Sequence, residues 1–260
     1  MEAEEEKIVE HAKEAIHALT DKKKNWKEKI GSFLWEILII IIAVNLTIWF
    51  HSWSEKRHDR ELEKNFLIGI RSDLDNVKNF LGYLINNSQP MIDYYDSVLV
   101  QINEHRIDKA FVDSNSFYLM TTSYFAYDNS RFESFKSSGY LRLIENDSLL
   151  QSLTGLYSTV LPFAIKLEDN TFDDRRRDYI KYIGSKVKFV NPERMEVNVS
   201  EFLNNPEVTF QLVWQKNMLI SRQNQQKYFQ QRVENTINII DQELRTRFNY
   251  KGKTDTALHN

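Results

Sequence analysis

The sequence predicts an all-α protein in which a single transmembrane helix continues into a soluble helical-bundle domain that ends in a long C-terminal helix. Three observations predict this fold. A strongly apolar run occupies residues 30–50 and is bordered by tryptophans. Apolar residues then recur at spacings of three and four along much of the chain, which is typical of amphipathic helices. Glycine and proline are scarce, at 7 and 4 of 260 residues, which disfavours a turn-rich β fold.

The membrane segment is predicted from its apolar centre and its aromatic borders. Residues 37–44 are all apolar, and their transfer into lipid favours insertion by about 3–4 kcal/mol. Trp35, Trp49 and Trp53 stand where indole rings meet the bilayer surface, and Glu36 lies near the same edge, where a charge costs less than at the centre. We interpret the run as an uncleaved signal anchor, because it begins about 30 residues into the chain and no small-residue cleavage site follows it.

We therefore expect four segments. They are a charged amphipathic tail at residues 1–29, a transmembrane helix at residues 30–50, a helical extracytoplasmic domain at residues 51–248 and a disordered tail at residues 249–260. The segment just before the span contains slightly more basic residues than the segment just after it. This difference predicts a cytoplasmic N-terminus. The amphipathic tail could lie on the membrane, contact a partner or remain a solvated helix.

Six apolar residues beyond the membrane segment form a heptad pattern, with spacings of three and four: Leu67, Ile70, Leu74, Val77, Leu81 and Leu84. Such a seam has two interpretations. It could be the buried face of one helix in an intramolecular bundle, or a face that binds a protein partner or a second copy of the chain. Three heptads are too few to choose between them.

Turn-forming residues predict where the remaining helices begin and end. The Asn-Asn-Ser-Gln-Pro stretch at residues 86–90 predicts a break, after which Ser88 caps a new helix and Pro90 lies in its first turn. A short helix is expected at residues 130–138, with Gly139 just past its end.

Further along the chain, Asp113 or Ser114 is expected to cap a short aromatic helix, and Asn146 or Asp147 a longer one with a kink at Pro162. Residues 195–199 alternate and predict one short extended piece, and a long last helix begins near Pro206. Its expected buried face is Phe229, Val233, Ile237, Ile240 and Leu244.

Two regions carry a family resemblance. The first region comprises Trp-Glu before the isoleucine run, the sequence at residues 51–57 that follows the span, and the Phe-Leu-Ile-Gly-Ile-Arg-Ser-Asp-Leu stretch at residues 66–74. The second region comprises the Lys-Ser-Ser-Gly segment at residues 136–139 and the Leu-Ile-Glu-Asn segment at residues 143–146. Together they resemble a bacterial family of single-span membrane proteins that contains a domain of unknown function. Trp35 stands where that family usually has glycine. The resemblance implies a cytoplasmic N-terminus and no particular activity.

Composition and motifs exclude several kinds of chemistry. A net charge of −3 gives no basic excess for nucleic acid, and the absence of cysteine excludes disulfides and thiolate sites. The His51, Glu55 and His58 side chains share a helix face, but no fourth metal ligand accompanies them. The charge run at residues 173–178 is interpreted as a solvated face on which Asp173 pairs with Arg177, although its three arginines could instead grip an anion.

The sequence thus predicts a non-enzymatic protein of the bacterial inner membrane, with one span, a cytoplasmic N-terminus and a periplasmic domain. Its expected partners are the lipid bilayer and either another protein or a second copy of itself. We expect no cofactor, no metal, no catalytic residue, no nucleic acid and no small-molecule substrate. The alternatives are a ligand-sensing extracytoplasmic domain that signals through a partner, and a hydrolase whose site has no familiar motif.

Overall fold

The protein is described here by a computed structural model, which places residues 26–121 and 124–250 together with Lys13 and Ile16. Most of the predicted amphipathic tail therefore lies outside the described residues, as does the predicted disordered tail beyond Tyr250. The backbone N–H of Tyr250 still donates to the carbonyl oxygen of Leu244 at 3.0 Å, so this residue is tied to the last helix. The chain divides into two compact units, Met1–Leu62 and Glu63–Asn260, and helix α2 (Trp26–Asn103) contributes to both.

The first unit contains a helical stretch that is long and apolar enough to cross a membrane. None of the residues in its most apolar window is buried. Two polar side chains inside it bond to their own helix: the Asn45 amide donates to the carbonyl oxygen of Ile41 at 2.7 Å, and the Thr47 hydroxyl donates to that of Ala43 at 2.9 Å. These bonds satisfy polar groups internally, as a hydrocarbon surrounding requires.

The second unit is built almost entirely of helices, and the described part of the chain is all-α apart from two short strands. Short elements follow α2: α3 (Lys109–Ser114), η1 (Ser116–Leu119), α4 (Ser130–Ser137) and η2 (Tyr140–Leu143). A continuous helical segment comes next: α5 (Asp147–Gly155), the π-helical turn η3 (Leu156–Val160), α6 (Leu161–Leu167), the π-helical turn η4 (Glu168–Asp173) and α7 (Asp174–Lys186). The last elements are β1 (Phe189–Asn191), η5 (Pro192–Arg194), β2 (Glu196–Val197), η6 (Val199–Phe202) and α8 (Pro206–Phe248).

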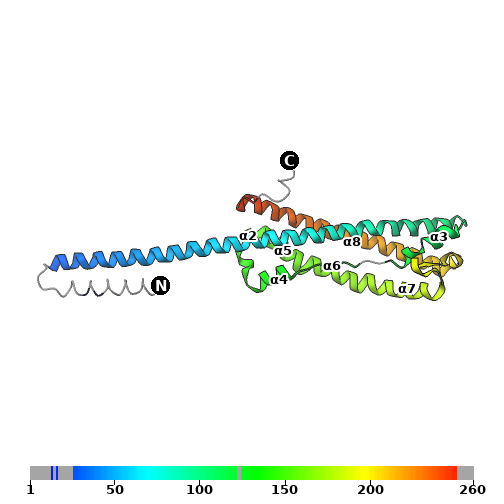
Figure 1. Ribbon diagram of the computed structural model, residues 1–260, viewed down its shortest axis with the longest axis horizontal. Coiled ribbons are helices and arrows are strands. Elements are labelled where there is room, and N and C mark those ends of the chain that lie inside the picture. Colours follow the sequence, from blue (N-terminus) through cyan, green and yellow to red (C-terminus); the bar gives the residue numbers. More distant parts are fainter. Residues whose placement is uncertain (1–12, 14–15, 17–25, 122–123, 251–260) are drawn as a thin grey trace. The chain divides into compact units, whose positions relative to one another are not determined.

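Helix α8 runs antiparallel to α2 within the second unit and also lies along the segment from α5 to α7 (Figure 1). Hydrogen bonds fix the first alignment, since rising numbers on α2 meet falling numbers on α8: Arg71 with Asp241, Lys78 with Gln230, Ile85 with Gln223 and Asp96 with Lys216. The second alignment is marked by the Ser152 and Thr236 hydroxyls, which lie 2.8 Å apart.

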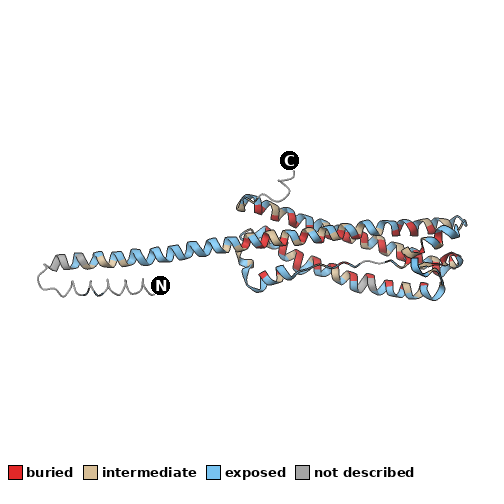
Figure 2. Ribbon diagram, in the orientation of Figure 1, coloured by how far each residue is buried: buried red, intermediate tan, exposed pale blue. Residues whose placement is uncertain are grey.

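Buried residues line the facing sides of these helices and form two apolar cores (Figure 2). The first core joins residues 66–84 of α2 to α4, to the segment from α5 to α6 and to residues 229–244 of α8. The second core joins residues 91–98 of α2 to α7, to the elements around the strands and to residues 208–219 of α8. The stretch Asp147–Leu167 is also long and apolar enough to span a membrane, but one third of it is buried and its leucines pack in the first core.

The heptad seam lies entirely in the first core, where each side chain is 6 % exposed or less: Leu67, Ile70, Leu74, Val77, Leu81 and Leu84. These six side chains therefore pack against other parts of the same chain. The expected buried face of the last helix lies in the same core, and the start of that helix at Pro206 is confirmed.

The predicted break at residues 86–90 is wrong, because α2 continues through Pro90 as far as Asn103. Proline removes the N–H that would bond the carbonyl oxygen of Asn86, yet Asn86 is exposed and water can reach it. Ser88 does not cap a helix; its hydroxyl donates to the carbonyl oxygen of Ile85 at 2.8 Å, and the Gln223 amide of α8 donates to the same oxygen at 3.2 Å. Bonds from a distant helix thus hold the turn together.

The predicted helix ends have mixed outcomes. Asn146 caps α5 as expected, since its side chain accepts from the Leu149 N–H at 3.1 Å, and Gly139 follows α4 with φ 73° in the left-handed region. The expected cap at Asp113 or Ser114 is wrong: both residues lie inside α3, which Asp108 caps. The Asp113 carboxylate instead accepts from the backbone N–H and hydroxyl of Ser200 at 2.9 and 2.8 Å, and so fastens η6 to α3.

The remaining expectations concern the segment between α5 and α8. Pro162 stands in the first turn of α6, directly after the π-helical turn η3. Of the extended piece expected at residues 195–199, only Glu196 and Val197 form a strand, β2, which pairs antiparallel with β1; Val199 already begins η6. Met195 is not part of the strand, because it adopts a left-handed conformation with φ 56°.

Candidate binding site

A polar layer separates the two apolar cores of the second unit. On α8 the buried positions change here from apolar side chains to Gln223 and Gln226, both nearly enclosed. The Gln223 amide nitrogen donates to the Ser88 hydroxyl at 3.2 Å and to the Gln89 side-chain oxygen at 3.1 Å on α2. The predicted helix break therefore marks the position of this layer, although the helix itself is intact.

The layer also holds a buried ion pair between η4 and α8. The Glu168 carboxylate accepts from the Arg222 guanidinium through two nitrogens, one of them Nε at 3.1 Å. The Gln226 amide approaches the same carboxylate at 3.4 Å. Glu168 is the first residue of the π-helical turn η4, and such turns occur frequently at functional sites.

Arg176 is the unusual member of this region. It is only 8 % exposed, yet its Nη2 has no hydrogen-bond partner in the described part of the chain. Burial lowers the pKa of its guanidinium, and the nearby Tyr95 and Tyr179 offset this only in part. Those two hydroxyls bond to each other at 3.1 Å, and burial raises both of their pKa values. Among the side chains that the structure describes, none forms an ion pair with this buried cation.

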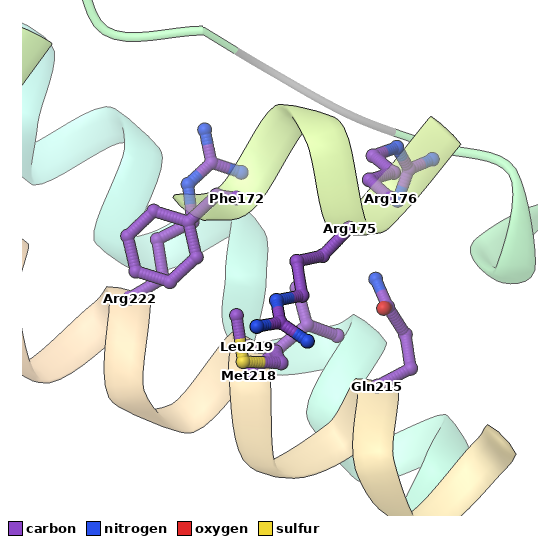
Figure 3. A pocket seen from close by; sticks show the side chains of 7 residues that line it. All are labelled: Phe172, Arg175, Arg176, Gln215, Met218, Leu219 and Arg222. Carbon is purple, nitrogen blue, oxygen red and sulfur yellow. The ribbon is translucent and has the colours of Figure 1, made fainter. Parts of the chain in front are cut away.

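A slot of about 20 Å³ lies between α7 and α8 beside this arginine, and Figure 3 shows the side chains that line it. We call it the arginine slot; its lining is Phe172, Arg175, Arg176, Gln215, Met218, Leu219 and Arg222. Arg175 points from α7 toward Met218 and Leu219 of α8, and the Gln215 amide rises toward α7 (Figure 3). Three arginines therefore belong to the lining, and Glu168 pairs with one of them, Arg222.

An open cleft of about 290 Å³ lies along the same two helices and shares Arg175 with the slot. Phe210 and Trp214 line it, and they are 61 % and 41 % exposed. Their rings stack with centroids 6.3 Å apart, and the Arg175 guanidinium lies 5.6 Å from the Trp214 ring centroid. Asp178 lines the same cleft. We call this surface the aromatic cleft.

The predicted solvated face at residues 173–178 is correct in part. Arg177 is exposed and pairs with Asp174; the predicted pair with Asp173 involves a side chain outside the described residues and stays a prediction. The prediction of an exposed side chain is wrong for Arg176, because this residue is buried. A signal was available: Phe172, Arg176, Tyr179 and Ile183 follow heptad spacing, so Arg176 occupies an apolar stripe.

The other predicted site residues lie apart from this region. Trp35, Trp49 and Trp53 are exposed on the first unit, and Arg57 lies over the Trp53 ring at 5.8 Å from its centroid; Glu36 lies among them in sequence. Among the described residues, no group of three or more histidine, aspartate or glutamate side chains is arranged to hold a metal ion.

A second charged cluster lies where the second unit begins. Arg247 contacts three carboxylates, with distances of 2.6 Å to Glu63, 2.9 Å to Glu145 and 3.4 Å to Glu243. The Asn146 amide donates to Glu243 at 2.7 Å. Glu63 is 1 % exposed, and burial raises its pKa to about 7, against the opposing effect of Arg247.

Comparison with protein-family models, with curated proteins and with solved structures finds no match for this chain. The resemblance to single-span membrane proteins accordingly stays a prediction.

Proposed function

We propose that residues 30–50 anchor the protein in a bacterial inner membrane, with the N-terminus in the cytoplasm, and that residues 51–248 form a periplasmic helical-bundle domain that binds a protein partner without catalysing a reaction. The exposed apolar window of α2 and its internally bonded Asn45 and Thr47 support the anchor. The basic residues before the span support the orientation.

The exposed aromatic cleft carries the proposal of partner binding. Tryptophan and arginine are enriched among the residues that dominate binding energy at protein interfaces, and Trp214, Phe210 and Arg175 come together here. The heptad seam is used within the chain's own core, so a partner requires another surface. The cleft provides one with apolar rings, a cation and a carboxylate.

The test is chemical cross-linking of membranes that contain the tagged full-length chain, followed by purification and mass spectrometry. We expect one protein to be captured by the natural chain and lost when Phe210 and Trp214 are both replaced by alanine. Tyr228→Ala is the matched control, because Tyr228 is an exposed aromatic residue on the same helix and lies outside the cleft. Capture that survives the double replacement, or that Tyr228→Ala also abolishes, contradicts the proposal. Capture of a second copy of this chain assigns the cleft to self-association.

Topology is tested separately with fusions to Asn260. Alkaline phosphatase is active only outside the cytoplasm, whereas a suitable fluorescent protein folds only inside it. We expect an active phosphatase fusion and a dark fluorescent fusion. The opposite pattern places the domain in the cytoplasm and refutes the orientation.

A further inference from the structure

We propose that two copies of the chain pair through their membrane helices, with the two Asn45 side chains hydrogen-bonded to each other across the interface. This inference rests on the proposed function, because it requires residues 30–50 to lie in the membrane. It goes further by assigning the surface through which the anchor binds and the partner that fits this surface, a second copy of the same helix.

The Asn45 side chain has unused hydrogen-bonding groups. A carboxamide can donate two hydrogen bonds and accept two. Asn45 donates one, to the carbonyl oxygen of Ile41 at 2.7 Å, and none of the described residues bonds its second N–H or its side-chain oxygen. Thr47 differs, because its single O–H already donates to the carbonyl oxygen of Ala43 at 2.9 Å. Asn45 therefore retains a donor and an acceptor that need a partner.

Lipid does not supply this partner at the depth of Asn45. The midpoint of the proposed span is residue 40, and Asn45 lies about 7.5 Å further along the helix axis. The hydrocarbon core extends about 15 Å to either side of the bilayer midplane. Asn45 is exposed on the helix surface, so its amide faces acyl chains. Polar side chains in this position form hydrogen bonds to a neighbouring helix.

A second copy of the same helix provides the matching groups. All copies insert in the same direction, so two helices run parallel and their Asn45 side chains lie at the same depth. Around a twofold axis each amide donates an N–H to the oxygen of the other, because a carboxamide is both donor and acceptor. Within the described part of the chain, the other long apolar stretch, Asp147–Leu167, packs its leucines in the first core and is not available for this role.

The helix face that carries Asn45 is suited to close packing. Positions that follow alternating spacings of three and four from Asn45 are exposed and mostly aliphatic, as at the seam of a two-stranded coiled coil. They are Gly31, Leu34, Leu38, Ile41, Ile48 and Ser52. Aliphatic side chains surround the span on every side, so the amide determines which face is used. One asparagine in such a seam also fixes the register of the two helices.

The test uses two serines just beyond the span and the absence of cysteine from the natural chain. Ser52 is seven residues from Asn45 and lies on nearly the same face of α2, whereas Ser54 is nine residues away, about 180° around the helix. A disulfide forms only when the two Cα atoms come within about 7 Å. The full-length chain with Ser52→Cys or Ser54→Cys is oxidised in its membranes, and the rate of disulfide-linked dimer formation is measured. We expect Ser52→Cys to cross-link much faster than Ser54→Cys.

A second replacement tests the amide itself. Asn45→Leu, added to Ser52→Cys, should slow the cross-linking by about tenfold, because the hydrogen bonds between the helices are lost. Asn45→Leu makes the span more apolar, so a failure to insert does not explain a slower reaction. Thr47→Val is the matched control, because it removes a polar group of the same span on the opposite face, and it should leave the rate unchanged.

Three results would overturn the inference. They are equal cross-linking rates of Ser52→Cys and Ser54→Cys, an unchanged rate when Asn45→Leu is added, and an equal slowing by Thr47→Val. If an alkaline wash releases the chain from the membrane, the anchor itself is refuted. A chain that stays in the membrane but does not cross-link at Ser52→Cys refutes the pairing alone.

The same assay separates this pairing from binding at the aromatic cleft. A pair held by Asn45 should survive the replacement of Phe210 and Trp214 by alanine, because the cleft belongs to the second unit. Cross-linking that disappears in this variant assigns the pair to the cleft and overturns the inference.

Discussion

Replacement of Glu63 by glutamine should stabilise the second unit, and by an amount that grows with pH. In the unfolded chain Glu63 loses its proton near its ordinary pKa of 4.5, but burial delays this loss until about pH 7 in the folded chain. Between these values the folded state holds more protons, so the free energy of unfolding falls as the pH rises. At about 1.4 kcal/mol for each pKa unit, the full effect is at most about 3.5 kcal/mol above pH 7 and is absent below pH 4.5.

Urea unfolding of the full-length chain in detergent, followed by far-ultraviolet circular dichroism, measures this effect. Glutamine resembles the protonated acid and can still accept a bond from Arg247, so the difference between variant and natural chain isolates the charge of Glu63. The difference should increase from about pH 5 to about pH 8. Glu145→Gln is the control, because Glu145 meets the same arginine on the surface, where an ion pair is worth about 0–1 kcal/mol. A difference that is constant or that shrinks with rising pH refutes the reasoning.

Replacements at three further positions test the packing of the second unit. Leu74→Ala should lower the free energy of unfolding by about 2–5 kcal/mol, and Leu74→Asp should unfold the unit. If Leu74→Asp instead gave a folded chain of reduced mass in light scattering, packing of this residue within one chain would be contradicted. Pro90→Ala should raise stability in urea by up to about 3 kcal/mol, because a backbone N–H returns to the Asn86 carbonyl, and a loss would show that the proline is needed. Asp113→Ala should cost about 1–3 kcal/mol in thermal unfolding, since Ser200 loses its acceptor; an unchanged midpoint would count against that anchor.

Features that depend on neighbours along the chain could be predicted from the sequence. The leucine seam follows from a spacing of three and four, and a buried face of α2 results whatever lies opposite. Asn146 caps α5 because its side chain needs only the N–H three residues later. Gly139 ends the α4 region because a left-handed residue is needed there and glycine adopts it without strain.

Features that depend on distant residues could not be predicted in this way. The helix continues through Pro90 partly because Gln223 supplies hydrogen bonds from α8, and nothing near residues 86–90 reveals that partner. The strand β1 was missed because its Phe189 and Val190 are both exposed and show no alternation. The inward position of Arg176 was missed because the three consecutive arginines suggested a surface, whereas the heptad stripe around them indicated a core.

The polar layer has a consequence for how α2 and α8 find their alignment. Leucine-rich seams are nearly periodic, so one helix could slide past the other by a heptad, about 10 Å, and still bury similar side chains. Such a slide would carry Gln223 away from Ser88 and Gln89 and leave its amide against hydrocarbon. An unsatisfied buried amide raises the free energy of the shifted alignments, so the native alignment is favoured over them. The buried glutamines thus fix the register of α8 along α2, which the apolar side chains alone would leave open.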